Sequence, residues 1–208
     1  MKLRLILFFI TSGVALVGVA PANAGNIALD ATVTIASLGG STILSTGTPL
    51  SVVTDGYFLP EGTSYDSGRP DAVEWNGTGL VLDISLGAEY NITGAIVQAD
   101  NNDTYMLQYW DSASSSWQLL YSVPTAGCCG FMTRPNGNQT TYATFASVET
   151  DMLQFSAVSG DNGYAVSEIQ VNGTPVSSGT PEPSSLLLFG SGLVGLVGLV
   201  RRKIALRG

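Results

Sequence analysis

The chain between residues 25 and 176 consists of short runs of β-branched and aromatic residues separated by clusters of Gly, Asn, Asp and Ser. Runs of this length and composition are typical of β-strands. No segment of this region keeps the 3.6-residue apolar period of an amphipathic helix, so an all-β domain is predicted. The pattern predicts about eight strands, at 31–37, 80–85, 92–99, 105–110, 117–121, 141–145, 152–157 and 164–171.

Some of these runs alternate between apolar and polar positions. Leu153, Phe155 and Ala157 would share one face of their strand, and Ile169 would lie opposite Glu168. A strand places alternate side chains on opposite faces, so one face of each strand is expected to be buried. Many short strands with turn-rich connections predict an antiparallel jelly-roll sandwich.

One interval does not show this alternation of short strands and turn clusters. Residues 38–79 contain Gly39-Gly40, Gly47-Thr48-Pro49 and Arg69-Pro70, and they are too many for a plain hairpin loop. We therefore expect this interval to be either functional or partly structured.

The first residues resemble no part of a soluble domain. Met1 to Arg4 is basic, residues 5–20 are apolar, and Ala22-Asn23-Ala24 places small residues at the positions that a signal peptidase inspects. Residues 1–24 are predicted to be a cleaved secretory signal peptide. An N-terminal membrane anchor is the alternative, and the cleavage site disfavours it.

The last residues form three different pieces in a fixed order. Pro181-Glu182-Pro183 cannot continue a helix, residues 186–200 carry no charge, and Arg201-Arg202-Lys203 is basic. The uncharged run is at the short end of what spans a bilayer as a helix. The basic cluster is expected on the cytoplasmic side.

This tail closely resembles the PEP-CTERM sorting signal of Gram-negative bacteria, which is read by a transpeptidase-like membrane enzyme, the exosortase. The resemblance implies export, transient anchoring in the inner membrane, cleavage near Pro181-Glu182-Pro183, and delivery to the cell surface or an exopolysaccharide matrix. A plain C-terminal anchor is the alternative. The expected organisation is a signal peptide at 1–24, a β domain at 25–176, a linker at 177–180 and the sorting signal at 181–208.

Removal of both terminal segments exposes a strongly acidic domain. Residues 25–176 contain fifteen Asp and Glu but only Arg69 and Arg134 as basic residues, a formal charge of −13. Such a surface repels nucleic acid and anionic headgroups, so neither is an expected partner. The chain has no His and the domain has no Lys, which excludes histidine catalysis, His-ligated metals and Schiff-base chemistry.

The only cysteines are adjacent, Cys128 and Cys129, between two glycines. In an exported protein they form a vicinal disulfide, an intermolecular bridge, or remain free. The flanking glycines suit a strained turn and favour the vicinal disulfide. Two adjacent thiols without a histidine make a zinc site improbable.

The order of features within the domain also resembles a discoidin-like domain of the galactose-binding-like jelly-roll class. The resemblance spans nearly all of residues 26–173. It rests on Asn26-Ile27-Ala28, Thr54-Asp55-Gly56, Glu74-Trp75, and the segments 80–87, 92–99, 105–117 and 165–173.

This class often carries a structural calcium ion, and the resemblance implies Asp55 and Glu168 as its side-chain ligands. Backbone carbonyls around residues 52–57 would complete the shell. Calcium takes six to eight oxygen ligands, and Gly56 lets the chain turn sharply. Tyr57 and Phe58 depart from the class pattern, which has a polar residue there. An ordinary turn at Asp55 and a solvated Glu168 are the alternative.

In the same class, loops at one end of the sandwich engage sugars or lipids. The candidates here are Tyr57, Phe58, Tyr65, Arg69 and Arg134, because aromatic faces stack on sugar rings and guanidinium groups bind hydroxyls or carboxylates. An ion pair with a neighbouring carboxylate is the more ordinary role for each arginine.

The three tryptophans, Trp75, Trp110 and Trp117, are expected in the core, because large aromatic residues dominate the cores of such sandwiches. Pairs of carboxylates hydrolyse glycosides in many enzymes. Glu74 and Asp83 are one candidate pair here, but no spacing distinguishes them from the other carboxylates of the domain. The sequence therefore predicts a non-catalytic surface protein that binds exopolysaccharide, or a structural envelope protein without a small ligand.

Overall fold

The computed structural model describes residues 25–66, 70–134, 142–176 and 188–192. The chain divides into two compact units, residues 1–174 and residues 175–208, and the second contains a short helical segment at 188–192. The predicted signal peptide and most of the sorting segment lie outside the described residues. Within the described ranges, no helix is both long enough and apolar enough to cross a membrane.

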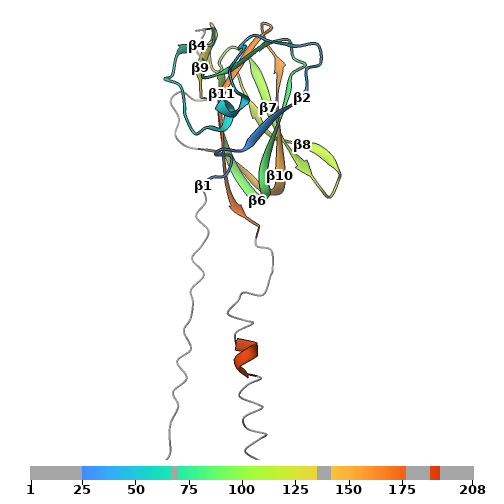
Figure 1. Cartoon of the computed structure of the whole chain (residues 1–208). Coiled ribbons are helices and arrows are strands. Elements are labelled where there is room, and N and C mark those ends of the chain that lie inside the picture. The colour runs from blue at the N-terminus through green and yellow to red at the C-terminus, as the bar shows by residue number, and fades with distance from the viewer. Residues whose placement is uncertain (1–24, 67–69, 135–141, 177–187, 193–208) are drawn as a thin grey trace, which may run out of the picture. The chain divides into compact units, whose positions relative to one another are not determined.

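The first unit is built from antiparallel strands in the order β3-β5-β11-β6-β10-β7-β8, with β1, β2, β4 and β9 attached at the side (Figure 1). The elements are β1 Gly25–Asn26, β2 Thr32–Ser37, β3 Thr42–Ile43, the 3-10 helix η1 Leu50–Thr54, β4 Thr63–Ser64, β5 Val73–Asn76, β6 Val81–Asp100, β7 Thr104–Asp111, β8 Ser116–Val123, β9 Phe131–Thr133, β10 Ala143–Ser159 and β11 Gly163–Pro175.

The predicted all-β fold is confirmed, but the strands are longer than the sequence pattern indicates. The expected strands at 80–85 and 92–99 are parts of β6, and those at 141–145 and 152–157 fall along β10, with residue 141 outside the described part. The register between β6 and β10 shifts at two places. Such bulges bend a strand, so the turn-like residues within β6 and β10 interrupt the pattern without ending the strands.

A large hydrophobic core joins the two halves of the sheet. Tyr105 and Phe155, from β7 and β10, stack with ring centroids 5.3 Å apart. Trp75 on β5 and Tyr164 on β11 approach the same Tyr105 ring at 6.2 and 6.1 Å. The sheet therefore closes on itself as a sandwich, with aromatic rings from both halves in contact across its interior.

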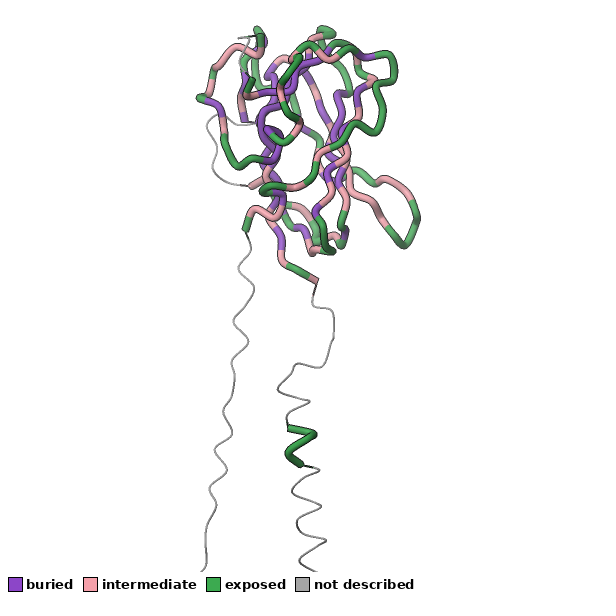
Figure 2. Tube along the Cα trace, viewed as in Figure 1, coloured by how far each residue is buried: buried purple, intermediate pink, exposed green. Residues whose placement is uncertain are grey.

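The burial pattern shows where this core ends (Figure 2). Leu153, Phe155 and Ala157 are buried, as the alternation predicts, and both hydrophobic clusters consist of residues between Ile27 and Val171. Among the described residues, both clusters therefore belong to the first unit.

β11 departs from the simple alternation, because it is buried on both faces. Ile169 is buried as predicted, but Glu168 on the opposite face is also fully buried. In a second hydrophobic cluster, Ala165 of β11 packs with Leu59 and with Met132 of β9. Alternation indicates which face of a strand is apolar, but it does not indicate whether a loop covers the other face.

The prediction that all three tryptophans lie in the core is only partly correct. Trp75 is buried in the main cluster. Trp110 and Trp117 are half-buried and pair edge to face across the β7–β8 hairpin, with ring centroids 5.4 Å apart, outside both clusters. They lie at the strand ends next to the turn, beyond the reach of the core.

Candidate functional site

An open pocket of about 340 Å³ lies in the long interval before β6. Its lining combines hydroxyl groups, one carboxyl group and a small apolar area, from Leu44, Ser45, Thr46, Gly47, Thr48, Pro70 and Glu74. The volume suits a small polar ligand, because pockets for such ligands begin at roughly 300 Å³.

Hydrogen bonds to the neighbouring strand β5 hold the pocket loop in place. The N–H of Leu44 donates to the carbonyl of Glu74 at 2.8 Å, and the N–H of Glu74 donates to Oγ of Ser45 at 3.0 Å. The loop closes with the N–H of Thr48 donating to the carbonyl of Ser45 at 3.1 Å, and Gly47 adopts a φ of 94° that suits glycine. These contacts preorganise the hydroxyl groups before any ligand arrives.

Ser41 fixes the start of the same loop. Its Oγ accepts hydrogen bonds from the N–H groups of Gly79 and Leu80, at 2.8 and 2.9 Å, and donates to the carbonyl of Gly77 at 2.9 Å. Gly39 and Gly79 cross so closely that a Cβ on Gly39 would lie 2.7 Å from the Gly79 backbone. The chain therefore needs glycine at this crossing to bring the pocket loop beside β5.

Among the described residues that line the pocket, the ionisable group is Glu74, which is 9 % exposed. Burial raises the pKa of this carboxyl group, and the negative charge of Asp66 raises it further. No basic residue is among the described residues that line the pocket. Its chemistry therefore favours a neutral ligand that offers hydroxyl donors over an anionic one.

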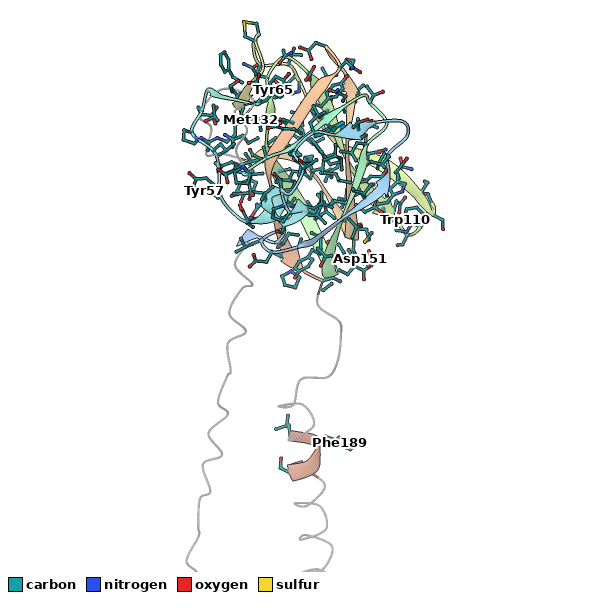
Figure 3. All side chains as sticks on the ribbon, turned by 45° about the horizontal axis from the view of Figure 1, so that its top comes forward. Tyr57, Tyr65, Trp110, Met132, Asp151 and Phe189 are labelled. Carbon is teal, nitrogen blue, oxygen red and sulfur yellow. A yellow bond between two sulfur atoms is a disulfide. The ribbon has the colours of Figure 1, made fainter. Side chains whose placement is uncertain are left out.

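The predicted ligand-binding residues do not gather in this pocket. Tyr57 is 57 % exposed at the margin of the domain (Figure 3). Phe58 lies beneath Arg134, whose guanidinium carbon is 4.5 Å from the ring centroid. Nε of Arg134 also lies 2.6 Å from Oε1 of Glu61, which is the ordinary ion-pair role. Arg69 lies outside the described residues, directly before Pro70 of the pocket.

Tyr65 is half-buried against the second hydrophobic cluster, at the end of the domain that carries the disulfide (Figure 3). Its N–H donates to the carbonyl of Gly130 at 2.9 Å. Cys128 and Cys129 are joined by a disulfide, and both are exposed. Of the three states that the sequence allows, the structure has the vicinal bond.

The two predicted calcium ligands lie close together, although they are far apart in the sequence. Asp55 follows η1, and the N–H of Gly56 donates to both carboxylate oxygens of Glu168 on β11, at 3.1 and 3.2 Å. Glu168 is fully buried. Burial raises its pKa to about 8, and the charge of Asp55 adds to the rise, while the Gly56 and Gln170 hydrogen bonds offset part of it.

The carboxylates of Asp55 and Glu168 repel each other, and a hard cation would neutralise this repulsion. The charged group that acts on buried Glu168 is another carboxylate, Asp55, and the donors are all oxygen atoms. Among the described residues, however, no three His, Cys, Asp or Glu side chains form a group that could hold a metal ion. An ion at this place would depend on main-chain oxygens around η1 for the rest of its shell.

A second acidic group, which is not among the residues predicted from the sequence, lies at the end of β6. Asp100 is 2 % exposed and Asp103 is fully buried. Burial, followed by the charge of Asp103, raises the pKa of Asp100 to about 7; the N–H of Asn102 offsets part of this rise. Burial also raises the pKa of Asp103. The available signal was the Asp-Asn-Asn-Asp run directly after an apolar strand.

The pocket residues were missed for a different reason. Ser45, Thr46 and Thr48 belong to the long interval that the sequence marked as functional or structured, but nothing in their spacing indicates a pocket. In the sequence, Glu74 belongs to the Glu74-Trp75 motif and is a candidate partner of Asp83, and neither feature predicts a pocket. The pocket forms because β3 pairs with β5, at Thr42 with Asn76 and Ile43 with Trp75, which brings the two halves of the interval together.

Comparison with protein families matches residues 180–203 to the PEP-CTERM protein-sorting motif. The chain carries a PEP-CTERM sorting motif. This confirms the interpretation of the tail, and it indicates an exported protein that is processed at the membrane. The matched residues lie almost wholly outside the described part, including Pro181, Glu182, Pro183, Arg201 and Arg202. No curated protein matches the chain in sequence.

Solved structures share the fold of the β domain of this chain. A fucolectin from the serum of Morone saxatilis (striped bass) has a TM-score of 0.52 and 14 % identity, over 76 % of this chain and 52 % of that one. The family 32 CBM from C. perfringens NanJ, solved with galactose, has a TM-score of 0.47 and 13 % identity, over 72 % and 98 %. SpGH29 has a TM-score of 0.46 and 15 % identity, but the match spans only 28 % of its length. At these identities, the likeness concerns the fold alone.

Proposed function

We propose that this exported protein binds a neutral glycan in the pocket beside β5 and catalyses no reaction on it. The observation that carries the proposal is the pocket itself, which is lined by the hydroxyl-bearing loop of residues 44–48 and by the buried Glu74. Sugar hydroxyls donate to carboxylates and exchange hydrogen bonds with Ser and Thr side chains. The excess of negative charge on the domain disfavours anionic polymers.

A glycan array tests this proposal. It uses residues 25–176, which contain both hydrophobic clusters of the described residues. We expect binding to neutral sugars and no binding to uronic acids. Glu74→Gln should weaken the affinity by about 10-fold or more, the value of a hydrogen bond to a charged group. Thr48→Val should weaken it less. Asp151→Asn, an exposed change on β10, is the matched control and should leave affinity unchanged.

The predicted aromatic site gives a competing location for the same function. If Tyr57→Ala abolishes glycan binding and Glu74→Gln does not, the ligand sits on the exposed aromatic residue and the pocket assignment is wrong. If the array stays silent with calcium present, the second reading holds, that of a structural envelope protein without a small ligand.

The same proposal includes a structural calcium ion between Asp55 and Glu168. Its support is the full burial of Glu168 beside a second carboxylate, an arrangement that a divalent cation would neutralise. Calcium should raise the melting temperature of the wild-type protein, and chelation should lower it again. Glu168→Gln should remove most of this response. An identical melting curve with calcium and with chelator would count against the ion.

We further propose that signal peptidase cleaves after Ala24 and that exosortase cleaves near Pro181-Glu182-Pro183. In this view the protein is held briefly in the inner membrane and then released to the cell surface or an exopolysaccharide matrix. A tag fused after Gly208 should be lost from the mature surface protein. Retention of the tag would indicate a plain C-terminal anchor.

A further inference from the structure

The turn between β6 and β7 packs against the turn between β10 and β11. β6 ends at Asp100 and β7 begins at Thr104, so the turn is only Asn101, Asn102 and Asp103. Oδ1 of Asp103 accepts a hydrogen bond from the N–H of Asp161 at 3.1 Å, and Nδ2 of Asn102 donates to Oδ2 of Asp161 at 2.8 Å. A Cβ on Gly160 would lie 1.5 Å from Oδ1 of Asp103, so the two turns are in direct contact.

Several buried oxygen atoms of residues 100–103 lack donors among the described residues. Neither carboxylate oxygen of Asp100 receives a hydrogen bond of good geometry from the described residues, although the side chain is only 2 % exposed. Oδ1 of Asn102 is likewise buried and without a donor among those residues. The second oxygen of Asp103 accepts a long hydrogen bond from the hydroxyl group of Tyr105, at 3.4 Å. A buried acceptor without a donor costs about 1–3 kcal/mol, and more if it is charged, so a group that satisfies several such oxygens is expected.

Protein side chains of the described part do not supply that group. The charges that act on Asp100 are those of Asp103 and Asp161, both negative. Arg134, the one basic residue in the described part of the chain, directs Nε to Glu61. Among the described residues, the oxygens of this turn therefore have the chemistry of a cation site.

We propose that the turn of residues 100–103 binds a divalent cation, with Ca²⁺ the best match, through the carboxylates of Asp100 and Asp103 and the amide oxygen of Asn102. All three donors are hard oxygen atoms, and neither nitrogen nor sulfur is present, which favours Ca²⁺ over zinc. No third acidic side chain of the described residues completes a metal-holding group. Water and main-chain carbonyls fill the shell, and an affinity of about 0.1–1 mM follows, as in other extracellular modules.

This site is separate from Glu168. Asp161, which bonds to Asp103 and Asn102, lies in the turn before Gly163, where β11 begins. Glu168 lies five residues further along β11, about 16 Å away at the spacing of an extended strand. The two ions would be bound independently, so each can be removed without the other.

Binding at this turn would also order the loop that carries the disulfide. The carbonyl of Asn101 accepts hydrogen bonds from the N–H groups of Ala126 and Gly127, at 2.8 and 3.1 Å. Its side-chain Oδ1 accepts one from the N–H of Phe131 at 3.0 Å. A cation that fixes residues 100–103 therefore fixes both ends of the loop around Cys128 and Cys129.

Terbium luminescence tests the proposal, because Tb³⁺ replaces Ca²⁺ and is excited by a nearby tyrosine, here Tyr105. The experiment uses the chain without its terminal segments and carries Glu168→Gln, which removes the other candidate ion. We expect sensitised emission that Ca²⁺ displaces, and a Ca²⁺-dependent rise in melting temperature. Asp100→Asn should abolish both effects, whereas the surface control Asp151→Asn should leave both intact.

A second variant keeps the test decisive if Asp100→Asn does not fold. Asn102→Asp adds a carboxylate to the turn and should tighten Ca²⁺ binding by about tenfold, because affinity rises with the number of charged ligands. Absence of emission in the Glu168→Gln protein would overturn the proposal. So would emission that survives Asp100→Asn, or tighter binding that fails to appear in Asn102→Asp. A calcium-insensitive protein that Asp100→Asn stabilises at pH 8 would show that the carboxylate pair shares a proton only.

Discussion

The buried carboxyl group of Glu168 makes the stability of the calcium-free protein depend on pH in a way that one substitution should remove. The side chain is fully buried, and it accepts hydrogen bonds from the N–H of Gly56 and from the side chain of Gln170. Glu168→Gln keeps the shape and an oxygen acceptor for that N–H, but it cannot ionise. The experiment is done with a chelator, so that no divalent cation compensates the charge.

The sign and size follow from the raised pKa of Glu168. The pKa of the carboxyl group rises from 4.5 to about 8 on folding, so the folded state holds the proton more tightly than the unfolded chain. The stability of the neutral group is fully present below pH 4.5 and is lost as the pH rises through about 8. Each pH unit in this window costs about 1.4 kcal/mol, with an upper value of about 5 kcal/mol for the whole span.

Urea unfolding at several pH values between 5 and 9 measures this effect as the difference between wild type and Glu168→Gln. We expect similar stability at pH 5 and a variant that is more stable than wild type at pH 9, by up to a few kcal/mol. The difference cancels the contribution of Asp100, which titrates in the same range in both proteins. A difference that stays constant with pH, or a variant that is less stable than wild type at pH 9, would refute the reasoning.

Three further predictions concern packing and covalent structure. Trp75→Ala should lower the free energy of unfolding by about 3–5 kcal/mol in urea titration, because the ring is 1 % exposed between two other aromatic rings. Gly160→Ala should destabilise the domain by about 1–3 kcal/mol, since its Cβ would collide with Asp103; an unchanged urea midpoint would show that the turn adapts. The purified chain under non-reducing conditions should be lighter than the reduced chain by two hydrogen atoms, through the disulfide of Cys128 and Cys129; an equal mass or a covalent dimer would contradict this.

The strand pattern was predictable where one face of a strand meets the core. Leu153 and Phe155 alternate with polar neighbours and are buried. The sequence missed β3, β4, β5 and β9, which are two to four residues long and have no period of their own. Such short strands exist because a longer strand lies beside them, as β11 lies beside β5. Local propensity therefore carries little information about them.

The candidate calcium site of Asp55 and Glu168 was predictable only through resemblance. The pairing of Asp55 with Glu168 came from the likeness to the discoidin-like class, and Gly56 does contact Glu168 across 112 residues. Nothing in the spacing of these residues requires the contact. The opposite case is Arg134, whose role as a glycan ligand stays a prediction, while its side chain is engaged by Glu61 and Phe58.

The sequence by itself determined the sorting motif of this protein and the class of its fold. Processing enzymes and the membrane recognise charge, hydropathy and small residues near the termini as properties of a linear segment. These properties are therefore visible in the sequence without the fold. Only the tertiary structure decided which polar groups lose their water. Glu74, Asp100 and Glu168 look like surface residues in the sequence, and each is buried because a turn or loop distant in the chain covers it. Burial of a charge depends on how the strands and loops pack together. The candidate pocket and cation sites can therefore be identified only from the tertiary structure.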